Sequence, residues 1–446
     1  MRRLLSNALL FAALGAPLFA RAEPPGDGSN HGLPERLSLA DAEEIFRARG
    51  LDVLIAEASA HGAEGDLVAA GQHPNPNLQP TVYYVPALSR DVLYGNLGNN
   101  ATTGTWGFGL GLDDNAGIED QLSGKRSLRI EAAAKALAAA RIGVEDVKRI
   151  ELSQLGQAYV AAVMAKRNMQ AAKETYDTYD VQLKLNQRQY DDGAIGRLDL
   201  SQVMTAQLEA LQALATARAG YDQAVASLVF LLGVRDGRPQ VTLTSDIEYR
   251  ALPALQGQSA DALLAQAIER RTDVRIAQRN LEQSEVALRA AKRALLPDVS
   301  VNAGYSEICS GGTCSSAPGF QLGLSGNLPV LYQQQGEIRR AETNVAQARR
   351  TLEKTKAQVL SDVTQGWASY AAAREQIERM QAKLIAEAKL SRDLAQVMYQ
   401  KGAASLVDFL FAERTYVASE LEYHQDLANY WSSVFQLEAA TNLRFH

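Results

Sequence analysis

The chain carries one unit of about 210 residues twice, and this duplication limits its fold more than any other feature of the sequence. Residues 38–84 align with residues 259–305 without a gap. Two later stretches repeat in the same order: Phe108, Gly111 and Gly124 match Phe320, Gly323 and Gly336, and Tyr190, Gly193 and Asp199 match Tyr399, Gly402 and Asp408. A unit of this length is far too long for a solenoid repeat. We therefore predict a first structural repeat over 38–234, a linker over 235–258 and a second structural repeat over 259–443.

The N-terminus has the pattern of a secretory signal peptide. Arg2-Arg3 precede a short apolar run, and Ala20-Arg21-Ala22 place small residues where a signal peptidase cuts. We predict a signal peptide over 1–22 and a Pro/Gly-rich flexible leader over 23–37. Loss of the three arginines of the signal peptide changes the formal charge from −6 to −9. An acidic mature chain has no basic stripe to neutralise phosphates, so nucleic acid is not an expected partner.

Four segments alternate between apolar and small or polar residues with the period of a β-strand. They are 78–85 and 104–112 in the first repeat and 298–306 and 319–325 in the second. Each has about 8–10 residues and one apolar face, which is typical of a tilted transmembrane β-strand. Four ordinary half-buried strands are the alternative, because they share this pattern. No segment after the signal peptide approaches 18 apolar residues, so we expect no transmembrane helix.

The rest of each repeat is typical of long helices. Residues from about 120 to 190 and from about 334 to 399 contain no proline and are rich in strong helix formers. A helix of about 70 residues is about 100 Å long. Each long helix ends in Tyr-x-x-Gly-Ala, after which a second helix runs back. We predict two helical hairpins, each with a left-handed glycine in its tip: about 120–232 with tip 190–199 and Gly193, and about 334–441 with tip 399–408 and Gly402.

With these features the sequence resembles the TolC-like outer-membrane factors, the channel-tunnels of Gram-negative efflux and secretion systems. The resemblance extends from Ser38 to about Leu443. It rests on the doubled strand pairs, the two Tyr-x-x-Gly-Ala tips and the segment 225–234. Residues 117–129 resemble the "IE…GGKR…R" segment of the heavy-metal (Czc-type) branch, although Ser123 replaces one of its glycines.

The resemblance implies an α+β membrane protein that works as a homotrimer. Four strands are too few to close a membrane barrel, since about eight is the minimum, whereas three chains supply twelve. The implied trimer has a 12-stranded transmembrane β-barrel among outer-membrane lipids and a periplasmic α-helical barrel. Its tips dock onto a periplasmic adaptor (membrane fusion protein), which an RND-type inner-membrane pump feeds.

The implied function is passive export of divalent heavy-metal cations, with no enzyme activity and no cofactor. Drug efflux and type I protein secretion are alternatives of the same class. A soluble periplasmic coiled-coil adaptor is an alternative of another class, but it predicts one hairpin rather than two. The five histidines are scattered, so we expect no dedicated metal site.

The resemblance also assigns candidate residues to the tips. It implies a closed tip in which Asp199 of one hairpin faces Tyr399 of the other, with Asp408 ringing the pore. Ala404 stands where a gating Arg is often found, and Arg197 is the candidate substitute. The candidate adaptor-docking residues are Tyr190, Asp191, Asp192, Gly193, Ala194, Lys401, Gly402 and Ala403. A blander interpretation is that acidic residues at helix starts only solvate a turn and favour the helix dipole.

Four cations and two cysteines complete the candidate residues. Lys125-Arg126 and Arg339-Arg340 follow the second strand of each pair, where cations anchor a barrel beside lipid headgroups. Cys309 and Cys314 are the only cysteines, in a loop that the predicted topology places outside the cell. We predict a structural disulfide there, worth about 2 kcal/mol at most, because such an environment is oxidising. Metal capture and a redox pair are the alternatives, although redox enzymes favour Cys-x-x-Cys at a helix N-terminus.

Overall fold

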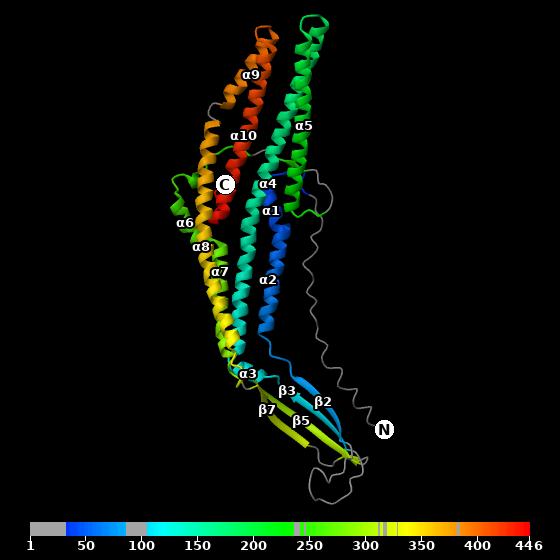
Figure 1. Cartoon of the computed structure of the whole chain (residues 1–446), viewed down its shortest axis with the longest axis vertical. Helices are drawn as coiled ribbons and strands as arrows, with labels where there is room; N and C mark the ends of the chain where they lie inside the picture. The colour runs from blue at the N-terminus through cyan, green and yellow to red at the C-terminus, as the bar shows by residue number, and fades with distance from the viewer. Residues whose placement is uncertain are drawn as a thin grey trace, which may run out of the picture.

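The protein is an elongated molecule with a sheet at one end and two helical hairpins at the other (Figure 1). The computed structural model describes residues 33–85, 105–235, 241–244, 247–310, 313–314, 319–327, 329–380 and 384–446. The predicted signal peptide, most of the predicted leader and the loop 86–104 lie outside the described residues. None of the described helices is long and apolar enough to cross a membrane.

Each half of the chain contains a short strand, two helices, a pair of main strands and a helical hairpin, in this order. The first half contains β1 (Arg36–Leu37), α1 (Leu39–Arg49), α2 (Leu51–Ala70), β2 (Asn77–Val85), β3 (Thr105–Asp113), α3 (Gly117–Leu122), α4 (Lys125–Asp191) and α5 (Arg197–Leu231). The second contains β4 (Thr242–Leu243), a 3₁₀ turn (Pro253–Leu255), α6 (Ala260–Arg270), α7 (Thr272–Arg293), β5 (Val299–Ser310), β6 (Thr313–Cys314), β7 (Gly319–Gly326), α8 (Gln335–Arg379), α9 (Ile385–Gln400) and α10 (Leu406–Thr441). The predicted α+β class, with long hairpins and four main strands, is confirmed.

The second long helix is described in two parts. We expected one helix from about 334 to 399, and the structure describes α8 up to Arg379 and α9 from Ile385. Met380 and Leu384 have right-handed helical backbone angles, and residues 381–383 lie outside the described residues. In the first repeat α4 is continuous for 67 residues.

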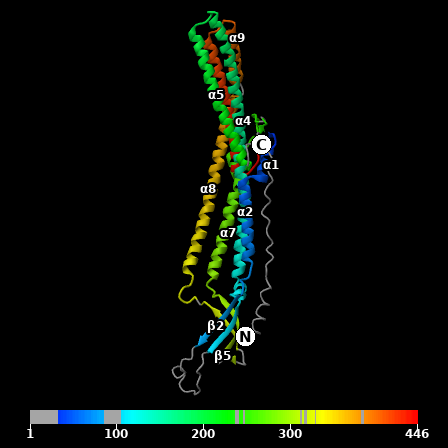
Figure 2. The same ribbon diagram turned by 90° about the vertical axis from the view of Figure 1, so that its right-hand side faces the viewer.

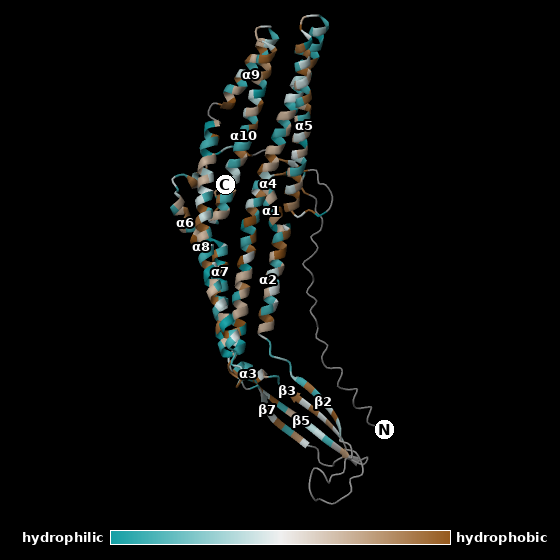
Figure 3. Cartoon of the chain, viewed as in Figure 1, coloured by the Kyte–Doolittle hydropathy of each residue, from teal (hydrophilic) through white to brown (hydrophobic). Residues whose placement is uncertain are grey.

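The four main strands form one antiparallel sheet in the order β2-β3-β5-β7. The register pairs Val82 with Phe108, Leu110 with Tyr305, and Tyr305 with Phe320, which places these side chains on one face. Apolar side chains on this face are exposed: Leu78, Val82, Tyr84, Trp106, Phe108, Leu110, Leu112, Tyr305, Phe320, Leu322 and Leu324. Glycines and polar residues occupy the other face, and Figure 3 shows the resulting alternation along the strands.

The main core lies midway along the molecule, where α1, α4, α6, α8 and α10 meet the small β1-β4 sheet. Three buried aromatic side chains attach β1 and the linker to the long helices. The Tyr159 hydroxyl donates to the carbonyl of Leu37 (2.9 Å), and the Tyr430 hydroxyl donates to that of Arg250 (2.8 Å). The Trp431 indole N–H donates to the Glu248 carbonyl (3.1 Å). These bonds satisfy polar groups that would be costly to bury alone.

Candidate functional site: the two hairpin tips

The two hairpin tips lie together at the end of the molecule opposite the sheet (Figures 1 and 2). Both contain the predicted left-handed glycine, with φ of 73° at Gly193 and 71° at Gly402. The Gly193 N–H donates to the Tyr190 carbonyl (2.9 Å), and the Gly402 N–H donates to the Tyr399 carbonyl (3.0 Å). Each Tyr-x-x-Gly-Ala is therefore a helix C-cap, in which a residue with a side chain would be strained.

The two tip aspartates cap the returning helices. Asp199 accepts a hydrogen bond from the Gly196 N–H (3.3 Å). Asp408 accepts from both the N–H (3.1 Å) and the hydroxyl (2.7 Å) of Ser405. The hydroxyl bond and then the N–H bond lower the pKa of Asp408. Capping thus accounts for both carboxylates within one chain, and their roles in a gate or a pore ring stay predictions.

Tyr399 connects the two hairpins, but through a partner that the sequence did not indicate. Its hydroxyl donates to Oδ1 of Asn186 on α4 (3.1 Å), not to Asp199. Its ring stacks on Phe409, with centroids 5.7 Å apart and an interplanar angle of 13°. Asn186 is fully buried, and its Oδ1 also accepts from Gln182 (2.9 Å). Among the described residues its Nδ2 has no partner, so this link contains an unsatisfied donor.

Below this link, a small apolar cluster holds the hairpins together. Its buried members are Tyr179, Val203, Ala206, Ala210, Leu406 and Phe409, from α4, α5 and α10. Tyr399 packs against the cluster from α9. An apolar cluster and the Tyr399–Asn186 hydrogen bond thus both connect the two hairpins near their tips.

The predicted docking residues form the outermost surface of the tips. Asp191, Asp192 and Lys401 are exposed, as are both turn glycines and the alanines that follow them. Tyr190 is half-buried, and Arg197 is exposed. The structure therefore brings these residues to a surface that is free in the single chain.

Of the four cations expected beside lipid headgroups, two make hydrogen bonds to other parts of the chain and two are exposed. The Lys125 ammonium donates to the Leu296 carbonyl (2.8 Å) and to Asp298 (2.6 Å). Arg126 donates to the carbonyl of Gly71 (3.0 Å). Both charged groups thus join the start of α4 to the elements beside the sheet. Arg339 and Arg340 are exposed, so among the four they are free to contact headgroups.

The sheet positions the two cysteines opposite each other. Cys309 is disulfide-bonded, and the register pairs it with Cys314 of β6. Adjacent positions on antiparallel strands have the Cα separation that a disulfide requires. A Cys309–Cys314 bridge stays our prediction, and this register supports it.

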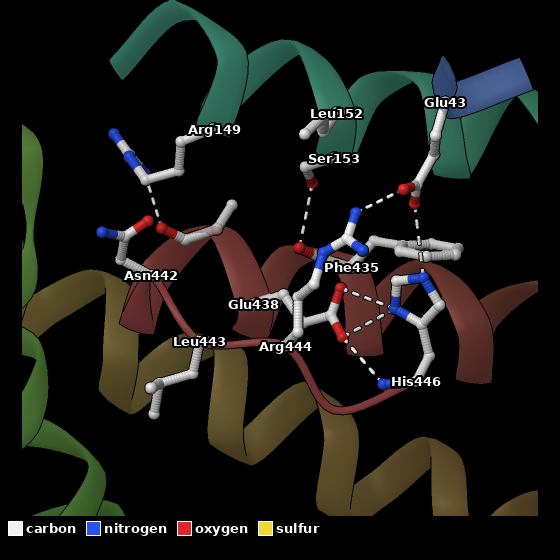
Figure 4. A pocket seen from close by; sticks show the side chains of 11 residues that line it. Glu43, Arg149, Leu152, Ser153, Phe435, Glu438, Asn442, Leu443, Arg444 and His446 are labelled. Carbon is white, nitrogen blue, oxygen red and sulfur yellow. Dashed lines mark hydrogen bonds and ion pairs between the residues drawn. The ribbon is translucent and has the colours of Figure 1, made fainter. Parts of the chain in front are cut away.

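A pocket near the C-terminal residues is lined by charged groups that neutralise one another (Figure 4). His446 contacts Glu438 (2.8 Å) and Glu43 (3.4 Å), and Arg444 also binds Glu43. Hydrogen bonds to Glu43 and Glu438 raise the pKa of His446 to about 9. Burial opposes ionisation of Glu43, but hydrogen bonds from His446 and Arg444 lower its pKa to about 2. These groups form an ionic clasp rather than a reactive site.

In the described part of the chain, no group of three or more His, Cys, Asp or Glu is arranged to hold a metal ion.

An exposed apolar sheet at one end and two long helical hairpins at the other form the arrangement that the sequence predicted for an outer-membrane export channel. A family model described as "Outer membrane efflux protein" matches residues 45–234 and 263–443, most of both repeats. The chain belongs to this family.

Known relatives and solved structures agree with this assignment. "Cation efflux system protein CusC" of Escherichia coli (strain K12) is 26% identical over 335 residues, covering 73% of this chain and 70% of that protein. "Nodulation protein T" of Rhizobium leguminosarum bv. trifolii is 24% identical over 400 residues, covering 86% and 78%. A crystal structure of CusC has a TM-score of 0.70 at 22% identity, covering 90% of this chain and 91% of that one. The Campylobacter jejuni CmeC outer membrane channel has a TM-score of 0.75 at 18% identity, covering 90% and 85%.

The protein is therefore an outer-membrane efflux channel of the Gram-negative type, which extends into the periplasm. Membership of a channel family confirms the predicted family and location and shows that the protein is not an enzyme. It also excludes the soluble adaptor, as does the presence of two hairpins rather than one.

Proposed function

We propose that three copies of this chain form the outer-membrane duct of a tripartite system that exports divalent heavy-metal cations. The unpaired edges of the sheet carry this proposal. β2 and β7 each have one edge without a partner among the described strands. In lipid, unpaired backbone groups cost several kcal/mol each. Pairing β7 of one copy with β2 of the next removes both edges, and three copies close a ring of twelve strands.

The exposed apolar face supports the same arrangement. Phe320 and Leu322 are each 81% exposed, and Leu324 is 75% exposed. An apolar patch of this extent is unfavourable in water and is typical of a lipid-facing surface. The glycine-rich opposite face would then line the interior.

The exposed tips support docking onto a periplasmic adaptor, and through it onto an RND-type pump. Asp191, Asp192 and Lys401 offer charged groups at the tip surface, and the C-capped turns hold their backbone in a fixed conformation. Rigid turns lose little conformational entropy when a partner binds.

Similarity to "Cation efflux system protein CusC" and the 117–129 segment favour metal cations as cargo. A passive duct needs only weak contacts with what passes through it, so a tight metal site is not required. Drug efflux or protein secretion is the second candidate, because a duct that makes only weak contacts imposes little selectivity of its own.

Deletion of the gene in a strain without a redundant channel tests the cargo. We expect increased sensitivity to zinc, cobalt, cadmium, nickel or copper salts, restored by the wild-type gene, with unchanged sensitivity to drugs. Unchanged metal tolerance with increased drug sensitivity would support the second candidate instead. Chemical cross-linking of the membrane fraction tests the assembly, and a monomer as the sole species would contradict the trimer.

A further inference from the structure

A carboxyl group without a partner lies between the two hairpins. Glu413 on α10 is only 3% exposed. Its side chain makes no hydrogen bond or ion pair with any described residue, and burial raises its pKa. Fully buried glutamates are rare unless they are paired, because removing a carboxylate from water is costly.

The cationic side chains near Glu413 already contact other groups. The guanidinium of Arg392 on α9 donates to Asp393 (2.6 Å) and lies over the Tyr416 ring, 4.2 Å from its centroid. Arg414 pairs with Glu209 of α5 (3.0 Å). The titratable and charged groups around Glu413 are Tyr179 on α4, Glu209 on α5, Arg392 and Asp393 on α9, and Arg414 and Glu420 on α10. Burial, and then the charge of Glu413, raise the pKa of Tyr179 to about 12. Among these groups Arg392 is the one whose positive charge most favours ionisation of Glu413.

The helix that carries Arg392 is the least firmly held helix of this region. α9 contains no buried residue, whereas α4, α5 and α10 each contain several. Tyr399 follows Arg392 by seven residues, two helical turns, so both side chains lie on the same face of α9. A shift of α9 that brings Arg392 to Glu413 would therefore also move Tyr399 relative to Asn186.

We propose that Glu413 is a positioning residue that sets the place of α9 through its charge. When neutral, it stays buried and unpaired, and Tyr399 remains bonded to Asn186. When ionised, it attracts Arg392 into an ion pair, α9 shifts, and the Tyr399–Asn186 link opens. This inference rests on the proposed function as an export duct and on the predicted closed tip of that duct.

The direction of the pH effect follows from the raised pKa of Glu413. The arrangement with Glu413 buried binds its proton more tightly than an exposed glutamate does, so it is favoured at low pH. The buried arrangement is no longer favoured once the pH rises through the raised pKa of Glu413. The shifted arrangement, in which the ionised Glu413 pairs with Arg392, is then the more stable one. Acid therefore closes the tip, and neutral pH favours its opening.

Single-channel recording in planar bilayers at mildly acidic and neutral pH tests the proposal. We expect the open probability of the wild type to rise several-fold as the pH is raised. Glu413→Gln, which keeps the shape and removes the charge, should stay low at both pH values. Glu422→Gln, at an exposed position of the same helix, should keep the wild-type profile. A wild-type profile in Glu413→Gln, or no pH dependence in the wild type, would overturn the proposal.

A distance measurement tests the movement independently of conduction. Nitroxides at Lys184→Cys on α4 and Lys389→Cys on α9 occupy exposed positions on the two helices, and Cys309 is already disulfide-bonded. We expect their separation to change with pH, and to stop changing when Glu413→Gln is added. An unchanged separation in the otherwise wild-type protein refutes the movement. If the wild type forms no channel at all, the proposed function fails, whereas the nitroxide distances still decide the inference.

Discussion

The two helical hairpins share their tips and differ along their length. Both tips have a left-handed glycine and an aspartate that caps the returning helix. α4 of the first hairpin is continuous and has buried residues from Leu137 to Asn186. In the second hairpin α9 has no buried residue. The duplication has thus kept the ends of the repeat, whereas the packing near the tips differs between the two hairpins.

The largest expected difference in stability comes from how closely the two long helices, α4 and α8, contact α10. A Cβ at Gly156 of α4 would lie 2.8 Å from the Phe435 ring, whereas one at Gly366 of α8 would lie 3.4 Å from Leu437 Cδ1. Gly156→Ala should therefore lower the free energy of unfolding by about 1–3 kcal/mol through overpacking. Gly366→Ala should change it by less than about 1 kcal/mol, because alanine's higher helix propensity offsets mild crowding. Thermal unfolding of the detergent-solubilised protein, followed by far-UV circular dichroism, measures both. Equal effects would mean that the two helices contact α10 equally closely.

The next largest expected difference is between the contacts that attach α1 to the core and those that attach α6. Glu43 of α1 aligns with Leu264 of α6, so an ionic clasp in one repeat corresponds to an apolar contact in the other. The raised pKa of His446, about 9 against 6.5, means that its contribution is complete below pH 6.5 and is lost as the pH rises through 9. The lowered pKa of Glu43, about 2 against 4.5, means that its contribution is complete above pH 4.5 and is lost as the pH falls toward 2.

His446→Ala should consequently cost roughly 2 kcal/mol at pH 6 and much less above pH 9. Leu264→Ala should cost roughly 1–2 kcal/mol at both pH values, because no charge is involved. Unfolding curves recorded at the two pH values separate these patterns. If the His446→Ala loss is equal at both pH values, the clasp is not ionic.

The sequence indicated the parts of this molecule that depend on local pattern. Alternation located the strand pairs, the helix-forming runs located the hairpins, and Tyr-x-x-Gly-Ala located the tips. Asn186 and Glu413 resemble surface residues of any helix, because their burial depends on which helix packs against them. The Lys125–Asp298 contact joins residues that are distant in sequence, so no local pattern indicates it.

The repeat-related tyrosines should differ in a channel measurement. Tyr399 bonds Asn186, but the residue aligned with Asn186 in the second repeat is Ala395, so Tyr190 has no corresponding partner. Tyr399→Phe removes a hydrogen bond worth about 1 kcal/mol, which corresponds to about a fivefold shift toward the open tip. Tyr190→Phe should leave the open probability unchanged. Single-channel recording at one fixed pH compares them, and equal open probabilities in the two variants would argue against the link as part of the gate.

The caps of the two tips should show the smallest difference. The Ser405 hydroxyl accepts from the Asp408 N–H (3.2 Å), whereas Gly196 occupies the same position before Asp199 and has no hydroxyl. Ser405→Ala should therefore speed hydrogen exchange in the first turn of α10 by up to about fivefold, and Gly196→Ser should slow exchange slightly at the start of α5. Hydrogen–deuterium exchange with mass spectrometry resolves peptides from each tip. The lowered pKa of Asp408 depends first on this hydroxyl, so in Ser405→Ala the carboxylate should be protonated at a higher pH than in the wild type. If Ser405→Ala also speeds exchange at the start of α5, the tips do not cap independently, and the two hairpins behave as one unit at this end.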